Sequence, residues 1–507
     1  MRVRGSDNRD RSSRFAGGAA SGAAVVGAGA AIMQAGLYGN SAAVIFSLAA
    51  VIGAASAALV MAVRAGRRIQ ASPTPMPGGA SGGRHPERQR VMHVVLLCLF
   101  GLAGISLLQL VVGHSHHSAA SAEACIRWLG TAGIVMLLHQ QHGKRKQQVV
   151  TANVVRDGSR IQISLLVTLG VLIGPVSIAG WFGLLPEQIS RGFLLVESDI
   201  RIASIGMRLS GFLQYPNAQG IFAAALLLLL LAVWTTHSAH RLMLFAGACL
   251  PAPLLLALLL SESRGAGLAC AAGAAAGALL LRGRRLALWL ASAGWASLCG
   301  ALACRIALAP APAAGAARAA ALLGCFAACA VGLAALRSRL LAPGAARQGR
   351  ALAASAALLA GGLAALAALP PAQLYARLGA HYETAASRAS LYQEALRLWR
   401  EAPLLGRGGD TWRQLAGRRF GIYEVHSGYL DILLNAGLLG LSIMLLMLAA
   451  LLIAIWRAGE YRILLAPILV MLLHAAIDFD MSYGCWWLLL FGIAAYGIDA
   501  RARSALP

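Results

Sequence analysis

The 507-residue chain is 59% hydrophobic and only 12% charged, and its formal net charge is +24. A soluble domain usually has about 25% charged residues, so this composition excludes a soluble enzyme, and its apolar content also excludes a disordered chain. The class that remains is a helical protein that crosses the membrane many times.

Runs of apolar residues long enough to cross a bilayer recur along the chain. A transmembrane helix needs about 20 apolar residues, and fourteen runs approach this length. Arg127 and Arg318 interrupt two of these runs, so the expected number of transmembrane helices is 12–14. We therefore predict an all-α polytopic membrane protein with helices near 16–36, 42–63, 91–112, 124–140, 161–185, 217–236, 242–260, 265–281, 286–309, 313–336, 351–369, 428–456, 461–477 and 484–500.

Lys and Arg residues collect in every second loop between these runs. Because basic residues are enriched on the cytoplasmic side of membrane proteins, this pattern predicts a multi-pass protein of the cytoplasmic (cell) membrane with both termini cytoplasmic. Two segments on the predicted outer side break the pattern, because 186–216 and the long polar stretch 370–427 both carry arginines. An anionic ligand on the outer face would explain those arginines.

The segment before the predicted helix at 217–236 contains Arg208 and the sequence Tyr215-Pro-Asn217. Pro216 and Asn217 favour the start of a helix, and a helix N-terminus offers free N–H groups to an anion. Arg208 would add a full positive charge to such a site. The alternative is an arginine that only extends to the membrane interface beside a helix cap.

The segment Ser261-Glu-Ser-Arg-Gly265 precedes another predicted helix. A charge beside the hydrocarbon is costly and is frequently functional, so Arg264 is a second candidate for binding an anion. Arg264 could equally face lipid headgroups or pair with Glu262. No G-x-S-x-G motif surrounds Ser263, so a serine hydrolase is not expected.

Residues 387–401, within the long outer stretch, place apolar side chains on one face of a helix and charged side chains on the other. We expect this amphipathic helix to lie along the membrane surface, or to pack as a lid with one solvated face. Arg388 is near the start of this segment.

Two motifs near the C-terminus carry titratable side chains on the predicted outer side. His426 follows the long outer stretch, and an imidazole is well suited to accept a proton near neutral pH, although it could also serve only as a hydrogen-bonding group. Asp478-Phe-Asp480 is similar to the D-x-D motif of metal-dependent glycosyltransferases, but one short match is weak. We expect these two carboxylates to pair with nearby arginines.

Taken together and in this order, the motifs resemble the O-antigen ligase and Wzy polymerase superfamily of bacterial envelope enzymes. That family transfers or polymerises glycans from an undecaprenyl-diphosphate carrier. The resemblance covers roughly 200–485, and it is carried by Arg208-Leu-Ser-Gly with Tyr215-Pro-Asn217, Ser263-Arg-Gly265, Ser387-Arg with Ala402-Pro-Leu-Leu-Gly406, and His426-Ser-x-Tyr-Leu with Ala436-Gly-Leu-Leu-Gly440.

The resemblance implies roles for individual residues. Arg208 and Arg264 match the arginines thought to hold the diphosphate, and His426 matches the proposed catalytic histidine. No metal or other cofactor is expected; the expected partners are the lipid-linked glycan donor, a glycan, lipid or protein acceptor, and membrane lipid, but no nucleic acid. The expected substrate-binding residues are Asn217, Tyr215, Ser263, Arg388 and Tyr429.

The predicted organisation has four parts. A cytoplasmic tail (1–15) precedes the N-terminal transmembrane helices (16–199), which include a cytoplasmic linker at 64–90. The ligase-like catalytic region (200–485) includes the extracytoplasmic loop 370–427, and a last transmembrane helix with a tail (486–507) ends the chain.

A transporter or flippase of lipid-linked saccharides is the alternative function. Such a protein would also need many transmembrane helices and arginines. It predicts charges near the middle of the bilayer and internal repeats, whereas the polar motifs of this sequence gather at the predicted outer face. We therefore favour an enzyme.

Overall fold

The computed structural model describes residues 86–143, 160–237, 239–309, 315–342, 348–379 and 381–504. Within them, seven helices are long and apolar enough to cross a membrane, or eight if the bent pair Arg241–Cys249 and Pro251–Leu260 is one span. The protein is therefore an all-α membrane protein with several spans. The predicted helices at 16–36 and 42–63 and the tail 1–15 lie outside the described residues, whereas each later predicted run coincides with one to three successive helical elements.

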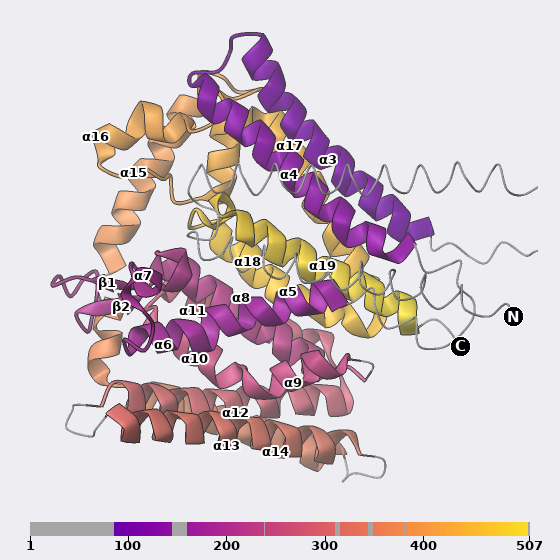
Figure 1. The fold of residues 1–507 in the computed structure, drawn as a ribbon, viewed down its shortest axis with the longest axis vertical. Helices are drawn as coiled ribbons and strands as arrows, with labels where there is room; N and C mark the ends of the chain where they lie inside the picture. The colour runs from indigo at the N-terminus through magenta and orange to yellow at the C-terminus, as the bar shows by residue number, and fades with distance from the viewer. Residues whose placement is uncertain are drawn as a thin grey trace, which may run out of the picture.

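The chain forms long helices joined by shorter helical elements (Figure 1). The longer helices are α3 (Pro86–Val111), α4 (Ser118–Gly143), α8 (Pro216–Trp234), α12 (Gly283–Ala307), α13 (Gly315–Leu341), α14 (Gln348–Ala368), α15 (His381–Arg400), α17 (Gly428–Trp456) and α19 (Gly484–Ser504). The shorter helical elements are α5 (Arg160–Val171), η4 (Leu172–Val176), α6 (Ser177–Trp181), α7 (Glu187–Ser190), η5 (Gly211–Leu213), α9 (Arg241–Cys249), α10 (Pro251–Leu260), α11 (Arg264–Leu280), η6 (Ala372–Gly379), η7 (Arg413–Gly417), α16 (Arg418–Phe420), η8 (Gly459–Leu464), α18 (Leu465–Ala475) and η9 (Asp480–Ser482).

Helix α8 is the centre of the bundle. Its sequence is apolar on all sides, so it is buried by α10, α11 and α18 rather than by one neighbour. Pro216 occupies the first turn of α8, where a missing N–H costs nothing, and Tyr215 before it is extended. This start of α8 fixes the position of Asn217.

Two outer groups of helices flank this centre. Helices α12, α13 and α14 pack side by side along one edge, and α3, α4 and α17 pack along the opposite edge (Figure 1). Only 22% of the most apolar stretch of α13 and 11% of that of α14 is buried inside the protein, although both helices are strongly apolar. These two helices therefore expose their side chains to lipid.

A two-stranded hairpin interrupts the helices before α8. Strand β1 (Leu194–Val196) pairs antiparallel with β2 (Met207–Leu209), and Leu195 is opposite Arg208. The backbone of Arg208 is thus held by strand pairing close to the start of α8.

Helix α17 is broken at Gly437, whose φ is +67°, and the preceding loop is hydrogen-bonded to the helix at this break. Arg407 N donates to Leu434 O (3.0 Å), and Leu438 N donates to Pro403 O (2.8 Å), so loop and helix exchange backbone hydrogen bonds. Gln109 on α3 joins both sides, donating to Leu405 O and Asn435 O. The motifs 402–406 and 436–440 are therefore one structural unit that returns the long loop to the membrane bundle.

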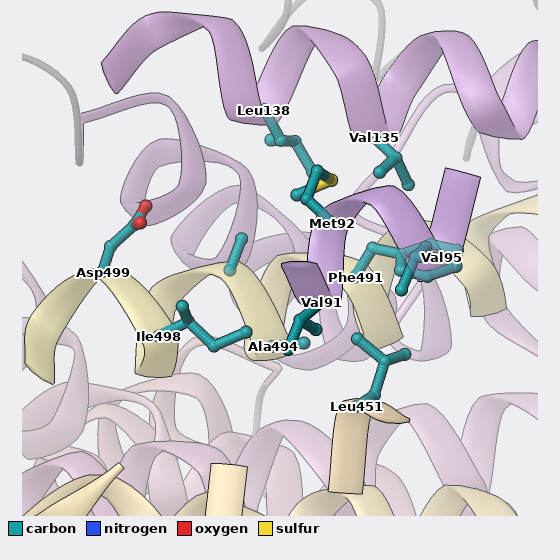
Figure 2. A pocket seen from close by; sticks show the side chains of 11 residues that line it. Val91, Met92, Val95, Val135, Leu138, Leu451, Phe491, Ala494, Ile498 and Asp499 are labelled. Atoms are coloured by element: carbon teal, nitrogen blue, oxygen red, sulfur yellow. The ribbon is translucent and has the colours of Figure 1, made fainter. Parts of the chain in front are cut away.

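A small cavity lies away from the motifs, between α3, α4, α17 and α19 (Figure 2). Its volume is about 30 Å³, and its walls are apolar except for Asp499, which accepts a hydrogen bond from Gln162 (3.0 Å). A space of this size holds about one water molecule. It cannot admit a substrate.

Candidate active site

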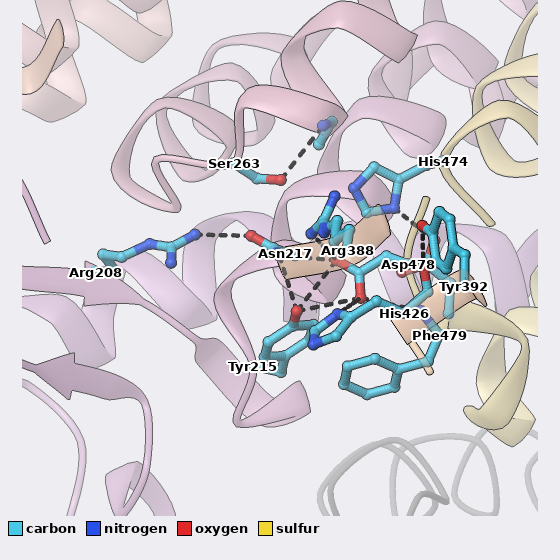
Figure 3. Close-up of polar contacts among 12 residues, drawn as sticks. Arg208, Tyr215, Asn217, Ser263, Arg388, Tyr392, His426, His474, Asp478 and Phe479 are labelled. Atoms are coloured by element: carbon cyan, nitrogen blue, oxygen red, sulfur yellow. Dashed lines mark hydrogen bonds and ion pairs between the residues drawn. The ribbon is translucent and has the colours of Figure 1, made fainter. Parts of the chain in front are cut away.

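Six of the residues singled out by their motifs, together with Asp478, lie close to the starts of α8, α11 and α17. Arg208 comes from β2, Arg264 begins α11, and Arg388 comes from α15. Asp478 lies between α18 and η9. The other three residues are Tyr215, Asn217 and His426. Figure 3 shows Tyr215, Asn217, Arg388 and His426 around Asp478, with Arg208 contacting Asn217. Arg264 adjoins this cluster through Arg388.

Asp478 is the centre of this cluster, and its side chain is 1% exposed. It accepts hydrogen bonds from Tyr215 Oη (3.1 Å) and Asn217 Nδ2 (2.7 Å). Its Oδ1 is 3.1 Å from Nδ1 of His426, and its Oδ2 is 3.8 Å from the guanidinium of Arg388. The carboxylate therefore ties together α8, α15 and the loop before α17.

The surroundings keep Asp478 ionised. Burial by itself would raise its pKa, but the hydrogen bond from His426 and the attraction of the two neighbouring histidines and Arg388 outweigh burial and hold the pKa well below its usual value. Burial and the charge of Asp478 together raise the pKa of Tyr215 well above its usual value. Tyr215 consequently keeps its proton and serves as a donor.

Arg208 is buried, with 5% of its surface exposed. Its Nε donates to Ser261 O (2.9 Å), and its Nη2 donates to Asn217 Oδ1 (2.8 Å). Because Asn217 in turn donates to Asp478, a continuous series of hydrogen bonds runs from Arg208 to His426 (Figure 3).

Arg264 stands at the first position of α11, where the hydroxyl of Ser263 caps the helix by accepting from Ala266 N (3.3 Å). The guanidinium groups of Arg264 and Arg388 are near enough to repel each other. Two guanidinium groups held this close together form a favourable place for a polyanion, and Arg388 also lies 3.8 Å from Asp478.

An apolar cavity of about 320 Å³ begins at Glu262, Ser263 and Arg264 and continues between the helices. This volume is within the range of about 300–1,000 Å³ that is usual for ligand sites. Leucines dominate its walls, from α8, α10 and α14, and Tyr375 of η6 closes one side. The cavity thus combines one charged end with an apolar interior.

Three backbone positions around the site adopt a left-handed conformation that non-glycine residues rarely adopt: Gln214 (φ 53°), Glu262 (φ 49°) and His426 (φ 52°). Each adjoins a site motif, and in the described residues Asp410 is the one other non-glycine residue with positive φ. Such strain is typical of functional sites, where neighbouring contacts stabilise it. At His426 these contacts include a hydrogen bond from Tyr392 Oη to His426 O (2.8 Å).

A second histidine–carboxylate pair adjoins the first. His474 on α18 and Asp480 are both buried, and His474 Nδ1 is 2.5 Å from Asp480 Oδ2. The expectation that both carboxylates pair with arginines was therefore wrong for Asp480 and incomplete for Asp478, whose closest side-chain contacts include His426 and Asn217. His474 was not among the residues predicted from the sequence, although an imidazole inside an apolar run is costly enough to indicate a functional position.

The structure brings together most of the expected site residues. Arg208, Tyr215, Asn217, Arg388 and His426 share the Asp478 cluster, and Ser263 and Arg264 line the mouth of the apolar cavity. Tyr429 is not part of the cluster's hydrogen bonds; its hydroxyl donates to Leu472 O (3.1 Å) and joins α17 to α18. Within the described residues, no group of three or more His, Cys, Asp or Glu side chains is arranged to hold a metal ion.

The amphipathic helix expected at 387–401 is the C-terminal part of α15. Its buried residues Leu391, Ala395 and Leu398 pack against Trp412 and Val425 in a separate small core. Its charged face carries the ion pair of Arg397 with Glu401 (2.7 Å). The helix is thus a packed lid whose start presents Arg388 to Asp478.

No protein-family model and no curated protein matches this sequence.

Proposed function

We propose that this protein is a membrane glycosyltransferase that transfers or polymerises a glycan from an undecaprenyl-diphosphate carrier onto an acceptor hydroxyl, on the outer face of the cytoplasmic membrane. One observation carries the proposal: an apolar cavity inside the helix bundle is lined at one end by Arg264, which is close to Arg388, and Arg388 is paired with the Asp478 carboxylate that also contacts His426. A lipid tail, a diphosphate and an acceptor hydroxyl are the three groups that such surroundings would accommodate.

The diphosphate end of the donor fits Arg264 and Arg388. A glycosyl diphosphate gains negative charge as its C1–O bond breaks, and guanidinium groups held in place stabilise that charge without reorganising. The start of α11 adds the partial positive charge of a helix N-terminus. The resemblance to O-antigen ligases assigns Arg208 and Arg264 to the same diphosphate.

The acceptor end fits His426. Its Nδ1 faces Asp478, so a neutral imidazole that donates from Nδ1 presents Nε2 as a proton acceptor. The acceptor oxygen attacks C1 of the glycan, and the C1–O bond to the diphosphate breaks with its electron pair left on the diphosphate. The hydroxyl proton passes to Nε2 of His426, and the new linkage has inverted configuration at C1.

A transporter or flippase would use the same cavity and arginines. It would not need a proton acceptor held by a buried carboxylate, and the polar groups of this protein collect at helix starts rather than along the cavity, whose walls are mostly apolar. For this reason we propose the enzyme first.

The test is a reconstituted transfer assay. The purified full-length protein in lipid nanodiscs is mixed with an undecaprenyl-diphosphate-linked oligosaccharide and candidate acceptors, and products are identified by mass spectrometry and NMR. We expect a new glycosidic bond of inverted configuration and release of undecaprenyl diphosphate. If no acceptor is glycosylated, and the protein instead speeds movement of the lipid-linked sugar across vesicle bilayers, the transporter function replaces this proposal.

A further inference from the structure

Arg208 is connected to His426 by hydrogen bonds through two intermediate side chains, Asn217 and Asp478. A guanidinium can only donate hydrogen bonds, so its contact with Asn217 must be to the amide oxygen. The amide nitrogen of Asn217 is thereby turned toward Asp478 and Tyr215 (2.7 and 2.8 Å). Arg208 thus determines which end of the Asn217 amide faces the carboxylate.

Asp478 transmits this orientation to His426. One carboxylate oxygen, Oδ2, accepts from Asn217, and the other, Oδ1, faces His426 Nδ1. A carboxylate fixed in this way selects the histidine tautomer with the proton on Nδ1 and leaves Nε2 to accept a proton. The direction of donation, from Arg208 to Asn217 to Asp478, is the same at each step.

We propose that Arg208 and Asn217 are positioning residues that act on His426 through Asp478, and that Arg264 and Arg388, not Arg208, hold the diphosphate. This inference rests on the proposed function and adds to it. Arg208 is buried and is hydrogen-bonded to Ser261 O and Asn217, as expected of a side chain that orients its neighbours and does not bind the donor itself.

Other titratable and charged groups face the Asp478–His426 pair and must stay constant in a test. They are Tyr215 before α8, Arg388 and Tyr392 on α15, and the pair of His474 with Asp480 at the end of α18. Variants are therefore confined to Arg208 and Asn217, with Arg264→Met as the matched arginine variant.

The first experiment is a double-mutant cycle on transfer. We expect Arg208→Met and Asn217→Ala each to lower kcat by roughly 10- to 100-fold, less than loss of the base itself, with the donor KM nearly unchanged. The double variant should lose no more than either single variant, because both break the same series of bonds. Arg208→Lys should retain more kcat, since an ammonium can still donate to Asn217. By contrast, Arg264→Met should raise the donor KM.

The second experiment needs no transfer activity. Diethyl pyrocarbonate modifies neutral imidazoles, and the rate at His426 is followed against pH by mass spectrometry of its peptide. When Asp478 loses the hydrogen bond from Asn217, the negative charge of Asp478 is less neutralised. The midpoint of the pH profile for modification of His426 should therefore move to higher pH. We expect equal shifts in Arg208→Met, Asn217→Ala and the double variant, in preparations that keep the thermal stability of the parent.

Two results would overturn this inference. One is a raised donor KM in both Arg208→Met and Arg208→Lys, with the effects of Arg208→Met and Asn217→Ala multiplying in the double variant. The other is a His426 profile that is unchanged in Asn217→Ala or that shifts additively in the double variant. If the transfer assay fails for the parent protein while the three shifts are equal, the proposed function is wrong and the coupling of Arg208 to His426 stands.

Discussion

The carboxylate of Asp478 lies 3.1 Å from Nδ1 of His426, although 52 residues separate the two in the chain. His426 ends the long loop that α15 and α16 form, and Asp478 follows α18. Their contact closes the loop onto the membrane bundle and gives the imidazole a defined orientation.

Replacing His426 should abolish most transfer without loss of donor binding. If its imidazole accepts the proton of the acceptor hydroxyl, His426→Ala should lower kcat by roughly 10²–10⁴-fold. The lipid-linked donor should bind with unchanged affinity, because the arginines are intact. His93→Ala, at an exposed position of α3, is the matched control. Nearly normal turnover in His426→Ala would remove this residue from the chemistry.

Arg264, which lines the cavity, and the neighbouring Arg388 should control affinity for the donor. Arg264→Met and Arg388→Met should each raise the donor KM, and inorganic pyrophosphate should inhibit the parent protein more strongly than either variant. Arg419→Met is the control, because this exposed arginine of the same loop pairs with Glu394 (3.6 Å) and does not line the cavity. Equal pyrophosphate inhibition in all proteins would exclude a diphosphate site between Arg264 and Arg388.

The apolar cavity should hold the lipid part of the donor. Gly267 lines it, and a Cβ there would meet no atom within 4 Å, so Gly267→Leu should fill the cavity without disturbing the helix. We expect lower activity with the undecaprenyl donor and a smaller loss with a short-chain analogue. Gly324→Leu on α13 is equally unhindered and lies outside the cavity lining, so it should be neutral. Equal losses for both donors would show that the tail lies elsewhere.

The lowered pKa of Asp478 predicts how its stabilising effect depends on pH. A carboxyl whose pKa is lower in the folded than in the unfolded chain stabilises the fold above the unfolded pKa, and this contribution disappears as pH falls through the folded pKa. The stability lost in Asp478→Asn should therefore be greatest above the usual value of 3.8 and should shrink below it. Thermal unfolding in detergent across this range measures it. A loss that stays constant into strong acid would contradict the assignment.

The break in α17 should not tolerate a side chain at Gly437. Gly437 has a left-handed φ, and a Cβ there would collide with the carbonyl oxygen of Leu404. Gly437→Ala should destabilise the protein by at least about 1–3 kcal/mol, the usual cost of such strain. Gly361→Ala on α14, where a Cβ meets nothing within 4 Å, should leave stability nearly unchanged. Similar unfolding temperatures for both variants would show that the loop at Leu404 can move to accommodate the added side chain.

Some structural details of the motifs followed from local sequence. Pro216 and Asn217 begin α8, and Ser263 caps α11, because turn and capping preferences act over a few residues. The apolar face of residues 387–401 also formed as expected, since side-chain periodicity follows the helical repeat. The partner of that face could not be read from the sequence, because Trp412 and Val425 reach it only after the loop turns back.

The sequence by itself determined that this is a helical membrane protein and where the apolar helices of the described residues run, because apolar length and helix boundaries are local properties of the chain. The tertiary structure decided which polar residues meet. Asp478 could have paired with any nearby arginine, and only the packing of α8, α15, α17 and α18 brings it against His426, Asn217 and Tyr215. The reason is physical: a buried carboxylate must satisfy its charge with whichever donors the fold brings within about 3 Å, and those donors come from segments far apart in the chain.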